Sequence, residues 1–544
     1  MGEKKPLPIG KDDFRKIREG GFYYIDKTLM IQDFIAAKDE VTLITRPRRF
    51  GKTLSLTMMR EFFDIGTDSK EIFNNLAIME TEHAARINSI PVIYFAFKSV
   101  KGTTVEELTF QLKQALRDEY GRYEKLFHGK LGEMVSGKSF SETFSVLMDR
   151  QAPYIYLSGA VSNLIKAVHE YYQIRPILLI DEYDQPIISS FEYGYHDRLS
   201  GFFSNFYGDA MKSNPALGQA LLTGVQRLAK ESIFSQFNNV RVYTVLDEKY
   251  APYFGLTEAE TEKTLKDYDL VLDETVQKKY NGYRFGGILM YNPWSVLNYA
   301  DIKILRNYWI NTSSNFLIKQ TLKNANKEFW DDFDRLAAGE EVPIWLTLET
   351  SYLERNDNFT FWGLFVNSGY LTALKWVHEK SAVVKIPNDE VMSEFQGMVA
   401  SIAGIRGTDL EKMFESLVNK NMEKFLEIYQ NIVISCTSYM DASENAYHML
   451  FLGMCITLRG AYKVSSNLES GYGRSDIILE ALNANYAHVI IEFKQGKDLQ
   501  RLKAEALEQI LEQKYAAHLK GEVICIGLAH DKKRCAMVYK TITQ

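Results

Sequence analysis

Short apolar runs that alternate with helical stretches dominate the first half of the chain and restrict its fold more than any other feature. Five such runs occupy residues 41–45, 91–97, 176–181, 220–225 and 240–245. Their β-branched residues are typical of buried strands, and helices are expected after Gly51, Thr104 and Gly159. Strands and helices that alternate in this way form a parallel sheet with crossover helices. We therefore predict an α/β domain over residues 1–246.

The chain is too long for one domain, since its 544 residues correspond to about three or four domains of ordinary size. Residues 247–425 are richer in Asn, Tyr and Trp, and their periodicity is mostly helical, which favours a lid or connector. Residues 426–544 begin with a helical stretch, followed by two short strands, a charged helix and another strand. This last region is expected to form a compact α/β unit.

Charge and cysteine content exclude several classes of protein. Lys and Arg number 64 against 70 Asp and Glu, a net charge of −6, so the bulk charge does not favour a strongly basic nucleic-acid or membrane binder. No CxxC pair occurs, and the four cysteines are expected to be buried thiols in a reducing compartment: Cys436, Cys455, Cys525 and Cys535. No apolar run reaches the ~18 residues of a membrane helix. We expect a cytoplasmic protein without a membrane partner.

A basic loop follows the first apolar run and leads into an amphipathic helix. It reads Arg46-Pro47-Arg48-Arg49-Phe50-Gly51-Lys52-Thr53. The glycine lets the backbone approach a phosphate, the lysine can reach the β- and γ-oxygens, and the threonine hydroxyl can coordinate Mg²⁺. Arg46 stands where the GxxxxGK[ST] pattern begins with glycine, so for the loop alone a basic turn before a helix stays the alternative. All eight residues are candidates for nucleotide binding.

Acidic residues after the third apolar run support a nucleotide site. Asp181 and Glu182 come just past the strand in ILLIDEYDQP, where Asp can hold Mg²⁺ and Glu can polarise the attacking water. Thr223 ends the next apolar run and can sense a γ-phosphate; a plain strand-end threonine is the alternative. Four arginines are candidates for stabilising the transferred charge, and the sequence does not choose among them: Arg46, Arg48, Arg49 and Arg227. We predict ATP and Mg²⁺ as ligands and ATP hydrolysis as the reaction.

A hairpin near the C-terminus sets two carboxylates opposite each other. The segment GRSDIILEALNANYAHVIIEFKQGK, with a turn centred on Ala484, pairs Asp476 with Glu492 and puts Lys494 on the same face. Carboxylates at that spacing can hold one or two Mg²⁺ or Mn²⁺ ions, and the lysine can orient water or stabilise charge on a phosphodiester. This is the logic of a D…ExK nuclease site. A solvated Glu–Lys pair is the alternative, although HVIIEF is too apolar for a solvent-facing edge.

Further residues could extend this site. Gln509 and Tyr515 belong to the helical pattern ALEQILEQKY and could project toward the same face. Glu444, on the preceding helix, is a candidate additional ligand, whereas His448 is expected to be structural.

These motifs resemble bacterial AAA-ATPase-like proteins fused to a PD-(D/E)xK nuclease-superfamily domain. The resemblance covers nearly the whole chain through the segments KKPLPIGKDDFRKIREGGFYYIDKTLMI, RPRRFGKT, LLIDEYDQP, LLTGVQRLAKESIFS, YNGYRFGG with YNPWSVLNY, YWINTSS, and DIILE with IIEFK. It implies an ASCE-type P-loop core, a helical middle region with a winged-helix option, and a restriction-endonuclease-like C-terminal domain. It also implies Walker A roles for Lys52 and Thr53, Walker B roles for Asp181 and Glu182, and nuclease roles for Asp476, Glu492 and Lys494.

The preferred hypothesis is an ATP-binding, ATP-hydrolysing protein with a metal-dependent nuclease domain. DNA is the expected nucleic acid, RNA stays open, and an oligomeric state is neither indicated nor excluded. One alternative is a nucleotide-switch ATPase whose C-terminal domain binds nucleic acid or protein without cleavage. Another is a regulatory ATPase that acts on protein partners. Ser475 stands where the superfamily name places Pro, a substitution that removes no catalytic group.

Overall fold

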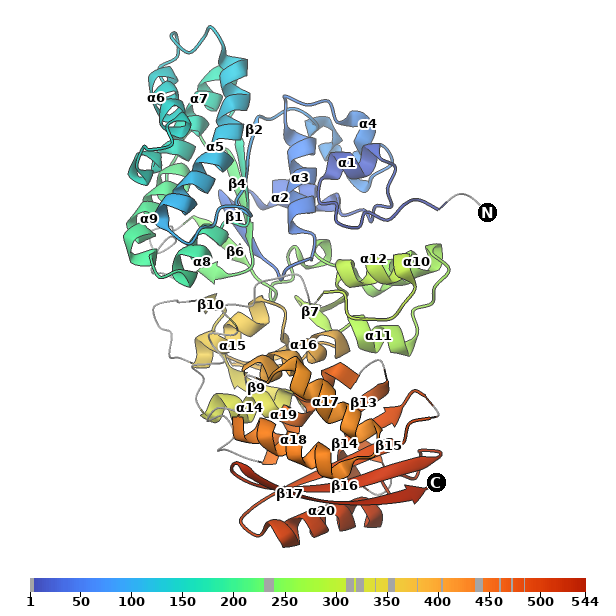
Figure 1. Ribbon diagram of the computed structural model, residues 1–544. Coiled ribbons are helices and arrows are strands. Elements are labelled where there is room, and N and C mark those ends of the chain that lie inside the picture. Colours follow the sequence, from blue (N-terminus) through green and yellow to red (C-terminus); the bar gives the residue numbers. More distant parts are fainter. Residues whose placement is uncertain are drawn as a thin grey trace. The chain divides into compact units, whose positions relative to one another are not determined.

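The computed structural model of the chain describes residues 4–228, 239–309, 318, 327–337, 339–350, 358–378, 380–402, 405–435, 444–458, 461–470, 473–483 and 485–544. The chain forms two compact units, each built from two segments of sequence (Figure 1). Unit 1 comprises residues 1–317 and 343–388, and unit 2 comprises residues 318–342 and 389–544. The domain boundaries that we predicted at residues 246 and 425 stay predictions.

Unit 1 contains the phosphate-loop sheet. Its elements up to residue 243 are α1 Phe14–Glu19, α2 Leu29–Ala37, β1 Val41–Thr45, α3 Lys52–Phe63, α4 Lys70–Phe73, η1 Ala77–Glu80, η2 Glu82–Arg86, β2 Val92–Ala96, α5 Val105–Phe127, α6 Gly137–Met148, η3 Tyr154–Leu157, α7 Ala160–Tyr172, β3 Ile177–Asp181, α8 Gln185–Glu192, α9 His196–Met211, β4 Gln219–Gly224, β5 Arg227–Leu228 and β6 Val240–Tyr243.

The five predicted strands form one parallel sheet in the order β2-β3-β4-β1-β6. Helices begin directly after Gly51, Thr104 and Gly159, as predicted. Figure 1 shows α5, α7 and α9 on one side of this sheet and α1 with α3 on the other. The predicted α/β fold with crossover helices is therefore confirmed.

Local sequence explains how these elements begin and why they are buried. The Thr104 side chain accepts a hydrogen bond from the Glu107 amide at 3.2 Å, which caps α5. Residues of β1 and β3 are buried throughout, as expected for a sheet with both faces covered. The apolar faces of α5, α7 and α9 pack with these strands into one core.

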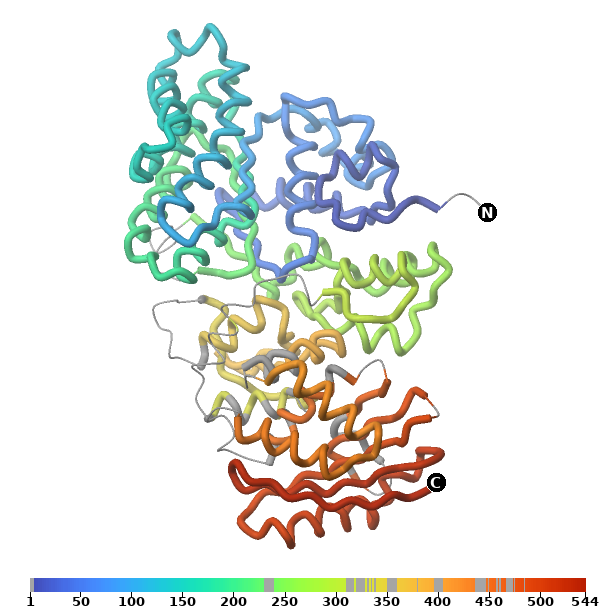
Figure 2. Tube along the Cα trace, in the orientation of Figure 1, coloured from blue at the N-terminus to red at the C-terminus, as the bar shows by residue number. Residues whose placement is uncertain are grey.

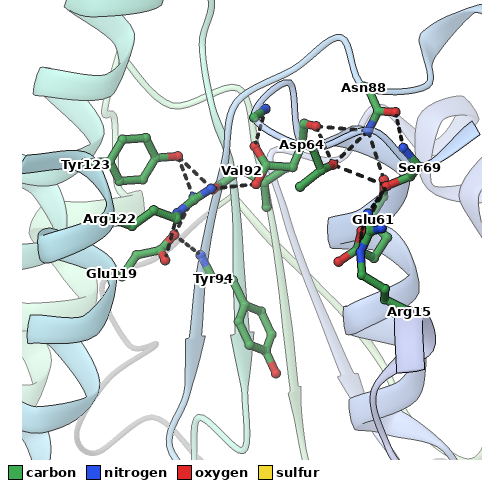
Figure 3. A network of polar contacts seen from close by, with 12 residues as sticks. Arg15, Glu61, Asp64, Ser69, Asn88, Val92, Tyr94, Glu119, Arg122 and Tyr123 are labelled. Carbon is green, nitrogen blue, oxygen red and sulfur yellow. Dashed lines mark hydrogen bonds and ion pairs between the residues drawn. The ribbon is translucent and has the colours of Figure 1, made fainter. Parts of the chain in front are cut away.

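A polar network ties α3 and α5 to the sheet (Figure 3). Arg122 on α5 donates hydrogen bonds to Asp64, just after α3, at 2.6 Å and to Glu119 at 2.7 Å. It also donates to the Val92 carbonyl at the start of β2. Glu119 accepts from the Tyr94 amide at 3.0 Å, and burial raises the pKa of its carboxyl. One guanidinium thereby holds together the end of α3, the helix α5 and the strand β2.

The rest of unit 1 is mostly helical, as predicted for the middle of the chain. Its elements are η4 Ala251–Tyr253, α10 Glu258–Asp267, α11 Glu274–Tyr280, β7 Tyr283–Phe285, β8 Ile288–Met290, α12 Pro293–Ile302, β9 Val342–Trp345, β10 Glu349–Thr350, α15 Asn358–Asn367, β11 Thr372–His378 and β12 Ser381–Lys385. The N-terminal residues Leu7, Tyr23 and Ile25 pack on the core of α10 to α12. The start of the chain is therefore part of this helical layer.

Unit 2 contains a five-stranded sheet in the order β13-β14-β15-β16-β17. Its elements are α14 Lys327–Ala337, α16 Asp389–Ile402, α17 Gly407–Val418, α18 Met422–Ser435, α19 Glu444–Met454, η7 Cys455–Leu458, β13 Tyr462–Ser470, β14 Gly473–Ala481, β15 His488–Gln495, α20 Leu499–Glu512, β16 Glu522–Asp531 and β17 Arg534–Thr543. Figure 2 follows β16 and β17 side by side along their length. We did not predict the two edge strands β13 and β17.

The two faces of the C-terminal sheet pack against different helices. Ile477 and Ile491 belong to a core shared with α17, α18 and α19, whereas Ile478 and Ile490 pack with residues of α20. This alternation follows the period of two in a strand. Helix α20 thus covers the face toward which the even-numbered residues of β14 and β15 point.

The cysteines that the structure describes are buried thiols, in agreement with the sequence analysis. Cys455, Cys525 and Cys535 are free and buried, as predicted, whereas Cys436 lies outside the described residues. In the described ranges, we find no helix with the length and apolar character needed to cross a membrane.

Candidate functional site

The basic loop between β1 and α3 owes its shape to a glycine. Gly51 has φ of 89° directly before α3, in the left-handed region that side chains rarely adopt. Nothing lies within 4 Å of the position that a Cβ would take there. Glycine is therefore favoured here by backbone conformation, and it directly precedes the N-terminus of α3, where an anion is favoured.

The Lys52 side chain binds to the backbone of this loop. Its ammonium donates hydrogen bonds to the carbonyls of Arg46 at 2.9 Å and Pro47 at 2.8 Å. Burial lowers the pKa of Lys52, and the carboxylates of Glu182 and Asp181 oppose that effect. A cation thus lies against the carbonyls of a loop that leads into the N-terminus of α3, and this combination suits a phosphate chain.

Asp181 joins the two threonines that the sequence singled out. Its Oδ2 accepts a hydrogen bond from Thr53 Oγ1 at 2.6 Å, and its Oδ1 accepts one from Thr223 Oγ1 at 2.6 Å. The pairing arises because β4 lies between β1 and β3 in the sheet. Hydroxyl and carboxylate oxygens are the ligands that Mg²⁺ prefers, so Thr53 and Asp181 fit such an ion.

Glu182 lies at the end of β3 with an uncommon backbone. Its φ is 53°, in the left-handed region where non-glycine residues are rare. Burial raises the pKa of its carboxyl, the Asp181 charge adds to the rise, and Lys52 and Arg48 oppose it. A carboxylate held at this strand end beside Lys52 can orient or deprotonate a water molecule.

Other loop residues mainly pack. Phe50 is buried, with its ring 4.9 Å from that of Tyr283 and 5.0 Å from that of Phe285. Pro47 is also buried, and a Cβ built on Gly369 would approach it to 2.8 Å. These contacts fix the loop against the helical part of unit 1.

Asp184 is a buried acidic residue that we did not predict. It accepts hydrogen bonds from the amides of Val225 at 2.9 Å and Gln226 at 2.8 Å, and burial raises its pKa. Tyr183 adds a hydrogen bond from its hydroxyl to the Gln226 carbonyl at 2.7 Å. The turn after Thr223 is therefore held by the segment after Glu182. The acidic run DEYD was the available signal.

A cavity next to the loop was also missed. It has a volume of about 610 Å³, including space open to solvent, and its walls are mostly apolar. Tyr23, Tyr24 and Tyr253 line it, together with Gly51 and Leu54 from the start of α3. Its apolar lining with three tyrosines suits an aromatic group. The signal in the sequence was the aromatic run GFYYID.

The predicted hairpin register near the C-terminus is confirmed. Ile477 pairs with Ile491 and Ile478 with Ile490, so paired residue numbers sum to 968. Ala484, the predicted centre of the turn, lies outside the described residues. β15 is the central strand of its sheet, in agreement with the apolar character of HVIIEF.

Asp476, Glu492 and Lys494 lie together on the face that α20 covers. Asp476 Oδ2 accepts a hydrogen bond from the Phe493 amide at 2.7 Å, and Glu492 Oε2 accepts one from the Asp476 amide at 3.3 Å. Lys494 Nζ lies 3.3 Å from Glu492 Oε1. Gln509 of α20 donates to the same carboxylate and lies 3.2 Å from the Tyr515 hydroxyl. The structure therefore brings all five residues together.

The two carboxylates repel each other in a poorly solvated place. The Glu492 side chain is 3% exposed, and burial together with the Asp476 charge raises its pKa to about 8. Burial also raises the pKa of Asp476. Because two ionised carboxylates in this place would exceed the charge of one ammonium, a bound cation would favour their ionised forms.

A metal ion at this site would depend on few protein ligands. Within the described residues, no group of three or more His, Cys, Asp or Glu side chains could hold a metal ion. Asp476 and Glu492 still offer carboxylate oxygens, which fit Mg²⁺ or Mn²⁺ with water completing the coordination. Glu444, which we predicted as an added ligand, begins α19, but its side chain is not among the parts that the structure describes.

His448 has a structural position, as expected. Its Nε2 donates a hydrogen bond to the Asp476 carbonyl at 3.0 Å. Burial lowers its pKa to about 4, so the ring is neutral at physiological pH. The histidine therefore helps to hold the backbone of β14 and adds no charge to the site.

Two family models match the chain. Residues 8–234 match the family described as predicted AAA-ATPase, and residues 442–540 match the PD-(D/E)XK nuclease superfamily. The chain therefore joins an AAA-ATPase-like region to a region of the PD-(D/E)XK nuclease superfamily, which confirms the resemblance stated above. Such regions support ATPase-type and nuclease-type function in general, and families of these kinds generally use nucleotides and divalent metal ions.

A curated relative from Azotobacter chroococcum mcd 1 is similar to part of the chain. It is called an uncharacterized protein in the vnfD 5' region and is 28% identical over 314 residues. The match covers 57% of this chain and 55% of the relative. The chain thus spans little more than half the length of the curated relative that it matches.

Proposed function

We propose that the chain hydrolyses ATP at the ends of β1, β3 and β4 and cleaves nucleic-acid phosphodiesters at the carboxylates of β14 and β15. DNA is the proposed substrate, and RNA is the alternative that the experiment below tests. The observation that carries the proposal is the convergence of Asp476, Glu492 and Lys494 on one buried face, with Glu492 at a pKa of about 8. A site that had lost its chemistry would be expected to lack one of these groups.

At the nucleotide site, each residue has a separate task. The loop amides and Lys52 neutralise the phosphates, and Thr53 with Asp181 would hold Mg²⁺. Thr223 keeps Asp181 oriented, and Glu182 orients the attacking water. The apolar cavity beside Gly51 would take the base. Its tyrosines favour an aromatic ring by stacking and area burial.

At the C-terminal site, Asp476 and Glu492 would hold Mg²⁺ or Mn²⁺. The ion, when bound, would supply a water of lowered pKa and neutralise phosphate charge. Lys494 orients that water or stabilises the charge that develops on the phosphodiester. Gln509 fixes the Glu492 carboxylate through its hydrogen bond, and Tyr515 holds Gln509 in turn.

The test is cleavage of labelled single- and double-stranded DNA and RNA with Mg²⁺ or Mn²⁺, with and without ATP. Wild type is compared with Lys494→Ala, Lys52→Ala and the control Lys497→Ala, an exposed lysine just beyond β15. We expect wild type to cut nucleic acid and Lys494→Ala to lose this activity. In Lys52→Ala, cleavage should no longer respond to ATP. Lys497→Ala should cut like wild type.

Two other results would change the assignment. If no substrate is cut with either metal while ATP is hydrolysed, the nuclease proposal is wrong and the C-terminal region is a binding module. If Asp476→Ala with Glu492→Ala alters no property of the chain, including nucleic-acid binding, the ATPase acts on protein partners and the hairpin is structural.

A further inference from the structure

Transfer of a phosphoryl group requires a positive charge near the oxygens that gain negative charge, and arginine commonly provides it. The sequence offers four candidates around the nucleotide site: Arg46, Arg48, Arg49 and Arg227. Their surroundings in unit 1 differ strongly, although they are indistinguishable by residue type.

Arg46 is enclosed in the protein. Its side chain is fully buried, and its guanidinium lies 5.3 Å from the ring centre of Phe254 and 5.4 Å from that of Phe285. One of its nitrogens donates hydrogen bonds to the carbonyls of Thr45 at 2.8 Å and Tyr243 at 3.2 Å. This arginine joins β1 to the end of β6.

Arg49 and Arg227 are also engaged. The Arg49 guanidinium lies 3.7 Å from the ring centre of Trp294, a cation–π contact with α12. Arg227 forms an ion pair with Glu349, where β5 runs parallel to β10. Either one would have to give up a contact before it could reach a phosphate.

Arg48 differs from these three. Within the described part of the chain, its guanidinium has no hydrogen-bond or ion-pair partner, and the residue is partly exposed. Its backbone is nevertheless fixed, because its carbonyl accepts a hydrogen bond from the Trp309 indole at 3.2 Å. The side chain therefore extends from a held position in the loop and keeps its charge available.

Arg48 lies directly beside the phosphate-binding lysine in the loop. The Lys52 ammonium donates hydrogen bonds to the carbonyls of Arg46 at 2.9 Å and Pro47 at 2.8 Å, and the Pro47 carbonyl belongs to the peptide bond that joins Pro47 to Arg48. The backbone of Arg48 is therefore held next to the ammonium that is proposed to contact the phosphates.

We propose that Arg48 contacts the γ-phosphate of ATP and stabilises the charge that its oxygens gain during hydrolysis. The inference rests on the proposed function of this site. In the reaction, the water oxygen bonds to the γ-phosphorus while the bond to the β,γ-bridging oxygen breaks. That electron pair stays on ADP, and the water proton leaves through Glu182 to solvent. The arginine comes from the same chain, so hydrolysis needs no arginine from a second copy.

The test compares wild type with Arg48→Ala, Arg48→Lys and the control Arg241→Ala, an exposed arginine on β6. Steady-state hydrolysis gives kcat and KM, and titration gives the affinities for ADP and for ADP with aluminium fluoride, which imitates the transferring group. For Arg48→Ala we expect kcat to fall about a thousandfold, ADP affinity to change less than about twofold, and tight binding of ADP with aluminium fluoride to be lost. Added guanidinium ion should restore part of kcat, and Arg48→Lys should lie between the two.

Several results would overturn the inference. An unchanged kcat in Arg48→Ala would do so, and so would a fall in ADP affinity as large as the fall in kcat. Activity regained on mixing Arg48→Ala with Lys52→Ala would assign the arginine to a second copy. If Arg48→Ala does not fold, the kcat and the aluminium fluoride binding of Arg48→Lys decide the matter. Absence of hydrolysis in wild type would instead refute the proposed function of the site.

Discussion

Replacing Glu492 with glutamine should stabilise the metal-free protein at neutral pH. The substitution keeps the shape of the side chain and replaces a buried carboxyl that must hold a proton at neutral pH by a neutral amide. Its neighbours Asp476, Lys494 and Gln509 all contact or face the carboxylate, so the change affects one compact site. The effect should depend on pH, because it arises from the proton that the native carboxyl retains.

The sign follows from the direction of the pKa shift. Glu492 has its pKa raised from 4.5 to about 8, so the native state keeps a proton that the unfolded state has lost. The contribution of Glu492 to the free energy of unfolding is therefore most favourable below about pH 4.5. It falls as the pH rises toward 8 and is constant above that. At 1.36 kcal/mol per unit, the loss at pH 7.5 reaches about 4 kcal/mol, and glutamine avoids it.

Calorimetry in EDTA between pH 5 and pH 8.5 measures this difference. At pH 7.5, Glu492→Gln should raise the Tm of the transition of unit 2 by roughly 8–16 °C, since 1 kcal/mol corresponds to about 2–4 °C in a unit of this size. At pH 5 the two proteins should differ by a few degrees at most. Glu508→Gln, on an exposed position of α20, is the matched control.

Two outcomes would refute the reasoning. A wild-type Tm that does not fall between pH 5 and pH 8 would mean that Glu492 is ionised in the native state. A variant that gains no more than Glu508→Gln at pH 7.5 would mean that the carboxylates of β14 and β15 do not repel each other. Mg²⁺ provides an internal check, because it should stabilise wild type and have little effect on Glu492→Gln.

Three further substitutions test other parts of the structure. Thr53→Val should weaken Mg²⁺-nucleotide binding by about 1–3 kcal/mol, because it removes the hydroxyl that Asp181 contacts, and should leave metal-free ADP binding unchanged by calorimetric titration. Gly527→Ala should lower the free energy of unfolding by about 1–3 kcal/mol, since its Cβ would lie 2.3 Å from a carbonyl oxygen of α20; equal urea midpoints would contradict this. Asp64→Asn should lower the free energy of unfolding by about 1–3 kcal/mol, as measured by urea denaturation, because it weakens the ion pair with Arg122 at 2.6 Å. Added salt should not cause a loss of this size in wild type.

The sequence was most informative where one physical rule acts alone. Strands β1, β3 and β4 of the first sheet are almost entirely buried and appear as continuous apolar runs. The edge strands β2 and β6 are less buried but still mostly apolar, and all five strands were found. The register of β14 and β15 followed from the period of two and a short turn, which is why Asp476 and Glu492 were paired correctly. The edge strands β13 and β17 were missed because polar and charged residues interrupt them, so neither contains a continuous apolar run or a strict alternation.

Features that depend on distant parts of the chain could not be predicted. The four arginines are alike as residues, and only the packing of Phe254, Trp294 and Glu349 separates Arg46, Arg49 and Arg227 from Arg48. The role of Asp184 depends on amides more than forty positions away, at Val225 and Gln226. Sequence spacing carries no information on such contacts.

The discontinuous construction of the two units has a consequence for how the protein is made. Helix α14 belongs to unit 2, and its Phe333 ring lies 4.9 Å from that of Phe395 on α16, yet residues 343–388 of unit 1 are synthesised between them. A ribosome therefore releases α14 before its partners exist. Unit 1 can complete its own core first, whereas the apolar side of α14 must wait for residues 389–544. A fragment that begins at residue 389 would lack this helix and expose the surface it covers, so the isolated C-terminal region should be produced together with residues 318–342.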